Sequence, residues 1–338
     1  MHNSSQDSPG NAQNLRMIDY NQHSEVQALA AKELSKLIGK YAAKLADELP
    51  SNETIQICEY GCATGGSSIA PIRAIKDAMG RRKLVLLMND LPMNDWKNLK
   101  KTVEAEFPDI NFKYIAKSMY TPITDNASTH LGYSCFAQHW LDNGAPTGLP
   151  GDALWSNQLP KTSLERQAWE TASRKDWERK LLLRANEIVS GGRLIIHIHS
   201  ATNSGALSEI FAATLQTAKR LMIAKGELSD EQVDAMHIPQ HCKSPAEIFN
   251  RLCTHQISSL WQLEEAHYYQ LSCDHVFQHN RVERQIDFLK SFMNSTLMAT
   301  LNADQLARFW EHVSELAHDN DAALSSNGMS TFLSLKRL

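Results

Sequence analysis

Apolar residues in the first third of the chain alternate between two periods, one typical of helices and the other of buried strands. Residues 24–48 carry apolar side chains at helical spacing, which predicts an amphipathic helix. Short aliphatic or β-branched runs then alternate with helical segments. The predicted order is strand, helix, strand, helix and strand, over residues 54–60, 67–79, 83–90, 95–107 and 112–120. This order is typical of an α/β fold with a doubly wound parallel sheet.

Helical patterns dominate the second half of the chain. Residues 164–189 form one long helical pattern that stops at a Ser-Gly-Gly sequence, and residues 193–199 (RLIIHIH) favour another strand. Residues 205–234 and 244–253 again have helical spacing, with few strand signals. Because no linker is evident, these helices predict a cap on the sheet and not an independent domain.

We therefore expect the chain to have four parts. A disordered polar tail covers residues 1–16, and a Rossmann-like core follows over residues 17–204. A helical cap is expected over residues 205–300. A C-terminal helix and strand, in residues 301–338, are expected to complete the core.

Composition narrows the function. The net charge of -4 gives no basic footprint for nucleic acid, and no apolar stretch is long enough to span a membrane. The N-terminal sequence MHNSSQDSPGNAQN lacks the apolar run of a secretory signal. The six cysteines are scattered without a CxxC pair, so neither a zinc site nor a disulfide framework is predicted. A reducing, cytoplasmic location is the expectation.

Two of the predicted strands end in sequences that suit a ligand. The first ends at Glu59 and Tyr60 and runs into the glycine-rich turn GCATGG, where the backbone can approach a ligand closely. The second ends at Asp90, and Pro92 stiffens the turn that follows. Ligands of open α/β sheets bind beyond the carboxyl ends of the strands. A carboxylate there can accept hydrogen bonds from both ribose hydroxyls, which predicts a nucleoside ligand.

Each feature alone has a simpler explanation, because glycine-rich turns are common and an Asp after a strand often caps the next helix. Their spacing is close to the roughly 20 residues expected between a glycine-rich turn and a ribose-binding acid. Glu59 would repel a pyrophosphate but suits a ligand that carries an ammonium and a sulfonium, namely S-adenosylmethionine. The turn is also a loose dinucleotide fingerprint without its middle glycine, so an NAD-dependent oxidoreductase is the rival hypothesis from another class.

Seven motifs resemble, in order and spacing, those of the SABATH methyltransferases. This family methylates the carboxylates of acids such as salicylate, benzoate, jasmonate and indoleacetate, and ring nitrogens in the caffeine pathway. The motifs are YNQHSEVQ (20–27), EYGCATG (59–65), LLMNDLPMNDW (86–96), SMY (118–120), HWL (139–141), GGRL (191–194) and HIPQH (237–241). The resemblance extends to about residue 275 and implies a Rossmann-like class I methyltransferase sheet with an α-helical cap. Its divergence suggests a microbial member.

The resemblance also implies roles for single residues. Gln27 and Trp140 would donate hydrogen bonds to the carboxylate of the acceptor. The residues around S-adenosylmethionine would be Tyr20, Ser24, Gln27, Glu59, Gly61, Asp90, Leu91, Ser118 and Met119. The acceptor pocket would also be lined by Phe136, His139, Phe211, Ala212 and His241. A homodimer is expected, with S-adenosylhomocysteine as product and no metal, membrane or nucleic-acid partner.

The predicted reaction is formation of the methyl ester of a small carboxylic acid. A carboxylate is ionised at neutral pH, so the transfer needs no general base, only an oxygen held in line with the methyl group. The alternative acceptor is a ring nitrogen or hydroxyl, with His139 or His241 as a base. Ala212 stands where small-aromatic methylators have a tryptophan, which predicts a larger pocket. His197 and His199 lack a third metal ligand at a suitable spacing, and are expected in the core or at the pocket edge.

Overall fold

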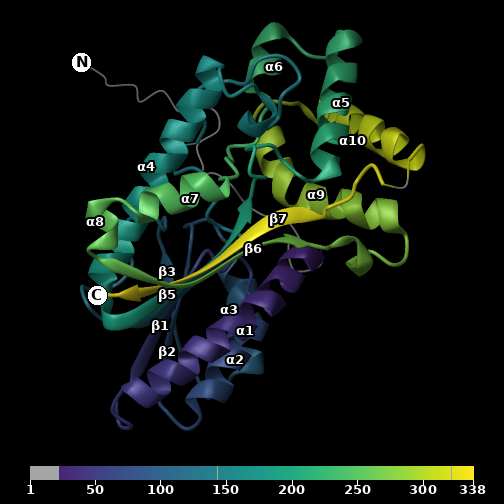
Figure 1. Cartoon of the computed structure of the whole chain (residues 1–338). Helices are drawn as coiled ribbons and strands as arrows, with labels where there is room; N and C mark the ends of the chain where they lie inside the picture. Colours follow the sequence, from purple (N-terminus) through teal and green to yellow (C-terminus); the bar gives the residue numbers. More distant parts are fainter. Residues whose placement is uncertain (1–22, 143, 321) are drawn as a thin grey trace, which may run out of the picture.

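A computed structural model of the chain describes residues 23–142, 144–320 and 322–338 (Figure 1). Its centre is a seven-stranded sheet in the order β3-β2-β1-β4-β5-β7-β6. The first five strands in this order are parallel, and β7 is antiparallel to both of its neighbours. The strands are β1 (Ile55–Tyr60), β2 (Leu84–Asp90), β3 (Asn111–Ala116), β4 (Thr129–Cys135), β5 (Ile188–Ser200), β6 (Trp261–Leu271) and β7 (Gly328–Arg337). The predicted doubly wound sheet is confirmed.

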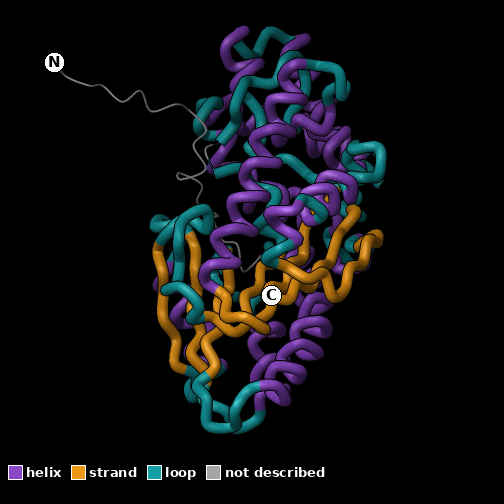
Figure 2. The backbone as a smooth tube through the Cα atoms, turned by 60° about the vertical axis from the view of Figure 1, so that its left-hand side comes forward, coloured by secondary structure: helices purple, strands orange, loops and turns teal. Residues whose placement is uncertain are grey.

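Helices cover both faces of the sheet, and Figure 2 shows them on either side of the strands. The amphipathic α1 (Glu25–Glu48) packs on α2 (Ile69–Met79), and with α3 (Trp96–Glu106) they bury one face. The other face is buried by α4 (Leu164–Glu187), α7 (Pro245–Leu252) and α8 (His255–Ser258). Alternate residues of one strand point to opposite faces, so Ile57 joins the first core and Cys58 the second.

The helical cap lies beyond one end of the strands (Figure 1). It contains α5 (Ile210–Ala224), α6 (Asp230–Ala235), α9 (Arg281–Leu297) and α10 (Ala303–His318). Aromatic and aliphatic residues of α5, α9 and α10 form a third core, which also takes in Val26 and Ala30 of α1. The cap therefore rests on the first turns of α1. No helix in the described ranges is both long and apolar enough to cross a membrane.

Three features differ from the sequence-based expectations. The strand β5 begins at Ile188, before the Ser-Gly-Gly sequence, and not at residue 193. The segment 205–300 is not entirely cap, because β6 belongs to the central sheet and pairs with β7. The helix α10 packs against α5 and α9 of the cap, so only the strand of the C-terminal segment completes the core.

The topology gathers the chemically interesting residues at one edge. The strand order reverses between β1 and β4, whose carboxyl ends point the same way as those of β2 and β5. Ligands of such sheets bind at this reversal. The cap lies over the same edge, so a ligand there would lie between the sheet and the cap.

Candidate active site

The glycine-rich turn after β1 is held by the carboxylate that ends β2. Asp90 Oδ2 accepts a hydrogen bond from the Ala63 N–H at 2.6 Å, and Oδ1 accepts one from the Leu91 N–H at 2.7 Å. The turn is tight, because a side chain at Gly61 (φ 84°) would place its Cβ 2.6 Å from the Cβ of Ala137. Each carboxylate oxygen keeps a second lone pair, so Asp90 can hold the turn and still accept a hydrogen bond from a ribose hydroxyl.

Glu59 is a buried carboxylate beside this turn. Its side chain is 3% exposed, and the Tyr133 hydroxyl donates a hydrogen bond to Oε2 at 2.9 Å. Burial raises the pKa of Glu59 to about 7, and the nearby charge of Asp90 also raises it. No cationic side chain of the described residues forms an ion pair with Glu59. The site therefore suits a ligand that brings its own cation.

Of the other cofactor residues implied by the sequence, Leu91, Ser118 and Met119 follow strands of the sheet, Ser24 and Gln27 lie at the start of α1, and Tyr20 is outside the described residues. Ser118 and Met119 follow β3, and Ser118 Oγ donates to Asp142 Oδ1 at 3.0 Å. Ser24, which is buried, precedes α1. Asn89 Oδ1, near the end of β2, and Gln138 Oε1, after β4, are buried polar atoms without a hydrogen-bond partner in the described chain. Unsatisfied groups of this kind are expected where a ligand or water completes a site.

A mostly apolar pocket lies between α1, the turn after β4, and the cap. Gln27 and Trp140 both line it, together with Phe136, His139 and Phe211. Gln27 Oε1 is buried without a hydrogen-bond partner among the described residues. The Trp140 backbone is fixed, because its carbonyl accepts a hydrogen bond from the Tyr120 hydroxyl and its residue bridges to Gln240. The structure thus brings the two neutral donors of the sequence prediction to one pocket.

The backbone at Phe136 is unusual for a residue with a large side chain. Its φ of 49° is in the left-handed region, which L residues other than Gly, Asn and Asp rarely adopt. Its N–H donates to the His197 carbonyl at 2.9 Å, and its ring packs 4.6 Å from the His197 ring, centroid to centroid. Such conformations concentrate at functional sites. Here the bend carries the chain from β4 to His139 and Trp140.

His139 is buried, and its Nδ1 has no hydrogen-bond partner in the described part of the chain. Burial lowers the pKa of His139 well below its usual range, and the nearby His199, Lys243 and Lys180 lower it further. The imidazole is therefore neutral at pH 7. It can accept or donate a hydrogen bond in the pocket, but it is a weak base.

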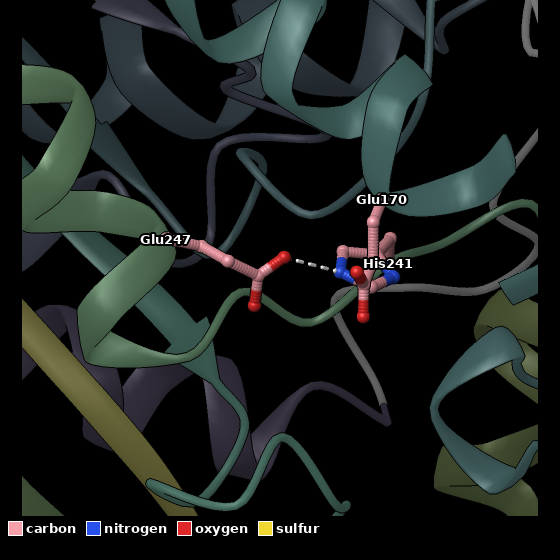
Figure 3. Close-up of side chains that lie close together, drawn as sticks. All are labelled: Glu170, His241 and Glu247. Carbon is pink, nitrogen blue, oxygen red and sulfur yellow. Dashed lines mark hydrogen bonds and ion pairs between the residues drawn. The ribbon is translucent and has the colours of Figure 1, made fainter. Parts of the chain in front are cut away.

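His241 does not line the pocket, contrary to the sequence-based expectation. It is fully buried, with Nδ1 2.9 Å from Ser156 Oγ and Nε2 2.9 Å from Glu247 Oε1. Figure 3 shows the side chains of His241, Glu247 and Glu170 close together, and their ligand atoms, within 4.8 Å of one another, could hold a metal ion. Both ring nitrogens already have partners, and Glu170 accepts from Arg166 Nε at 2.7 Å. The cluster is therefore a satisfied hydrogen-bond network that ties α7 to the loop before α4.

Ala212 also differs from the expectation. It is 3% exposed and belongs to the cap core, and its carbonyl accepts a hydrogen bond from Gln158 Nε2 at 2.8 Å. The pocket is lined by its neighbour Phe211 instead. A small residue at position 212 thus does not enlarge the pocket directly.

The two histidines of β5 have different surroundings. His197 is fully buried among the rings of Phe136, Phe332 and Tyr269, and burial lowers its pKa well below its usual range. His199 lines the pocket and pairs with Glu209 through Nε2. Both positions fall within the expectation that these histidines lie in the core or at the pocket edge. The sequence analysis did not identify Glu209, because a contact between residues ten apart across a loop follows no spacing rule.

Comparisons with known proteins agree with this geometry. The family model described as SAM dependent carboxyl methyltransferase matches residues 14–338. Methyltransferase FUS9 of Gibberella fujikuroi is 28% identical over 241 residues, which cover 68% of this chain and 64% of FUS9. Salicylate carboxymethyltransferase of Clarkia breweri is 25% identical over 243 residues, covering 65% and 66% of the two chains. The matched region of this chain therefore spans slightly less than two thirds of the length of these relatives.

A solved structure shows the same fold over the whole chain. Loganic acid methyltransferase with SAH superimposes with a TM-score of 0.80 at 19% sequence identity, over 96% of this chain and 98% of that one. The fold expected from the sequence, a class I methyltransferase sheet with a helical cap, is confirmed.

Proposed function

Because the chain belongs to the family of S-adenosylmethionine-dependent carboxyl methyltransferases, we propose that it converts a small carboxylic acid into its methyl ester. The observation that carries this proposal is that Gln27 and Trp140, two neutral hydrogen-bond donors, line one mostly apolar pocket. Family membership also sets aside the oxidoreductase alternative. The relatives' names support a carboxylate acceptor, since one is a salicylate carboxymethyltransferase.

S-adenosylmethionine carries the methyl group on a sulfonium. When the methyl group is transferred, the sulfur leaves as the neutral thioether of S-adenosylhomocysteine. The buried Glu59 would bind its ammonium, and Asp90 would accept hydrogen bonds from its ribose. Gly61 lets this turn pack closely against Ala137, where any side chain would collide. The unsatisfied buried atoms at the same strand ends fit this assignment.

The remaining catalytic requirement is position. Gln27 and Trp140 would hold one carboxylate oxygen about 3 Å from the methyl carbon, in line with the leaving sulfur. Neutral donors suit this task, because the transition state carries less negative charge on the acceptor than the ground state. A full counter-charge would stabilise the ground state more than the transition state. No proton has to move.

A ring nitrogen or hydroxyl acceptor is the second candidate, and the buried, unpartnered Nδ1 of His139 is the observation that favours it. The lowered pKa of His139 argues against a role as base. A homodimer and a cytoplasmic location stay predictions.

The proposal is tested by measuring transfer of a labelled methyl group to a panel of carboxylic acids, phenols and heterocyclic amines. We expect label to enter only acids. Gln27→Leu should reduce the transfer, because the amide donor to the carboxylate is lost. Gln216→Leu is the control, since the half-buried Gln216 of α5 does not line the pocket and, among the described residues, its side chain donates to Asp152. Transfer to phenols or amines but to no acid would overturn the proposal.

A further inference from the structure

The acceptor pocket contains a second polar region that the methyl transfer described above does not use. We call it the Glu209 patch and define it by pocket-lining residues: His199 of β5, Glu209 before α5, and Ser326, Gly328 and Ser330 at the start of β7. His199 and Ser330 are directly opposite in the β5–β7 ladder. Cross-strand neighbours project to the same side of a sheet, so both side chains face the pocket together.

Glu209 is the central group of this patch. It is 5% exposed, and its two oxygens accept hydrogen bonds from His199 Nε2 and from the Ser208 N–H at 3.1 Å. An ionised carboxylate has about four acceptor positions. The described residues fill two of these positions, so two remain for a ligand.

The surrounding residues hold Glu209 in place and leave it space. His199 Nε2 pairs with the carboxyl group of Glu209. Burial by itself lowers the pKa of His199, but Cys242 and Glu209 raise it well above its usual range. The second ring nitrogen of His199 is 3.4 Å from Cys242 Sγ. A side chain at Gly328 would place its Cβ 1.9 Å from Glu209 Oε1. Glycine at this position is thus required for Glu209 to lie where it does.

The hydroxyl of Ser330 is a second group of the patch that is available to a ligand. Ser330 Oγ is buried and has no hydrogen-bond partner in the described chain, although Ser330 lines the pocket and is 1% exposed. Leaving a buried hydroxyl without a partner is unfavourable, because the group has given up its hydrogen bonds to water. A hydroxyl can both donate and accept, whereas Glu209 only accepts. Together they match a ligand group that donates one hydrogen bond and accepts another.

Charge decides which group that is. His199 and Glu209 form an ion pair, so the positive and negative charges of the patch offset each other and do not attract a cation. An ammonium group would lie beside the imidazolium, and a second carboxylate would lie beside Glu209. Both arrangements bury like charges close together. A neutral hydroxyl meets neither difficulty.

We propose that the Glu209 patch binds a hydroxyl group of the methyl acceptor, so that the acceptor is a hydroxylated monocarboxylic acid. This inference rests on the proposed function, because it takes the carboxylate to be held by Gln27 and Trp140. The ring of His199 lies 5.5 Å from that of His139, and Gln27, Trp140 and Glu209 line the same pocket, so one acceptor can reach both groups. The apolar side chains of Leu207, Phe211, Leu271, Phe288 and Phe292 would cover that skeleton.

The test uses matched acids on two skeletons, phenylpropanoic acid and a straight-chain fatty acid of six to ten carbons. Each is used unsubstituted and with a hydroxyl, an amine or a second carboxylate at successive positions. Binding to the full chain with S-adenosylhomocysteine is measured by calorimetry, and ester formation is measured separately. We expect at least one hydroxy acid to bind roughly 10- to 100-fold more tightly than its unsubstituted parent, because the parent leaves buried polar groups unpaired.

Two variants assign the preference to the patch. Glu209→Gln and Ser330→Ala should each reduce the ratio of hydroxy-acid to parent affinity by roughly tenfold. Ser330→Ala removes no hydrogen bond of the described structure, so it provides a variant that folds. Glu231→Gln, at an exposed position of α6, is the control and should leave the ratio unchanged.

The outcomes separate the two levels of the proposal. Ester formation from unsubstituted acids, with no hydroxy acid preferred on either skeleton, would overturn the Glu209 assignment and leave the proposed function standing. A preference that survives both variants would also overturn the assignment. If no acid binds and no ester forms, both proposals fail.

Discussion

Asp90 and Ala63 are joined by a hydrogen bond of 2.6 Å, from the Ala63 N–H to Oδ2, which links the end of β2 to the turn after β1. The bond makes the carboxylate part of the turn that would contact the cofactor. Ala63 has a φ of 45°, so the turn needs such support. Asp90 therefore has two roles, to shape the turn and to bind ribose, and a substitution there should affect both.

The first prediction is that Asp90→Asn weakens binding of S-adenosylhomocysteine by roughly 1–3 kcal/mol, because charge-assisted hydrogen bonds are lost. Calorimetry measures the change. Asp95→Asn is a matched control five residues away, since Asp95 caps α3 and asparagine caps equally well. Equal affinities of wild type and Asp90→Asn would remove Asp90 from the cofactor site.

The second prediction concerns Glu59 and pH. Because the pKa of Glu59 is about 7 in the folded chain, the carboxyl is largely protonated at pH 6 and ionised at pH 8. Only the ionised form attracts the ligand's ammonium, so affinity for S-adenosylhomocysteine should fall as pH decreases from 8 to 6. In Glu59→Gln, affinity should be lower and nearly constant over this range. A wild-type affinity that does not change with pH would contradict the assignment.

The third prediction is that the same substitution, Glu59→Gln, has opposite effects on ligand affinity and on stability: it lowers the affinity but stabilises the ligand-free chain. A carboxyl whose folded pKa is raised destabilises the fold above its unfolded pKa of about 4.5, and the cost grows until pH passes 7. Glu59→Gln should therefore stabilise the ligand-free chain by about 1–3 kcal/mol at pH 8 and by nearly nothing at pH 4. Urea unfolding at the two pH values measures this. Equal gains at both values would mean that ionisation of Glu59 is not the cause.

The fourth prediction distinguishes Ala212 from Phe211. Because Ala212 is packed in the cap core, Ala212→Trp should destabilise the chain, by more than the 1–3 kcal/mol typical of overpacking, and should not simply narrow the range of acceptors. Phe211→Ala should widen that range, since Phe211 lines the pocket. Turnover over a size series of acids, with thermal unfolding of each variant, provides the comparison. A stable Ala212→Trp enzyme that accepts only smaller acids would contradict the placement of residue 212.

Much of the fold follows from local sequence patterns. The helix expected over residues 24–48 is α1, and the run that ends at Asp90 is β2. Both segments have one dominant pattern: helical spacing in α1 and the buried LVLLMND run in β2. The cap at Asp95 likewise marks where α3 begins. The edge strand β6 was missed because only its first and last residues are buried. An edge strand with charged residues on both faces has no alternating pattern to detect.

The positions of the candidate site residues could be predicted where they depend on strand ends. They could not be predicted where they depend on contacts between loops. Glu59, Gly61 and Asp90 could be located because parallel strands end at one edge. His241 lies at a motif position, but its ring is paired with Ser156 and Glu247 and does not line the pocket. Ser156 is 85 residues away in the sequence, and Glu247 belongs to α7. Likewise, the pairing of His199 with Glu209 depends on the space left by Gly328, more than a hundred residues later.

The pKa values of the pocket histidines limit what a pH profile can reveal about the acceptor. An unperturbed histidine base gives an inflection at about pH 6.5, but the pKa of His139 is well below that range and that of His199 well above it. A flat rate near neutrality therefore no longer distinguishes a carboxylate acceptor from a His139 base. Trp140→Phe is more direct, because the ring stays while the indole N–H is lost. It should reduce turnover of acids at saturating cofactor.

The chemical bond formed in the product tests the central claim most directly. Labelled product from the best acid in the panel is isolated and treated with mild alkali, and release of labelled methanol is measured. We expect the label to be released completely, because a methyl ester is hydrolysed under these conditions. Label that stays on the product would mean a methyl ether or a methylamine, and would contradict a carboxylate held by Gln27 and Trp140.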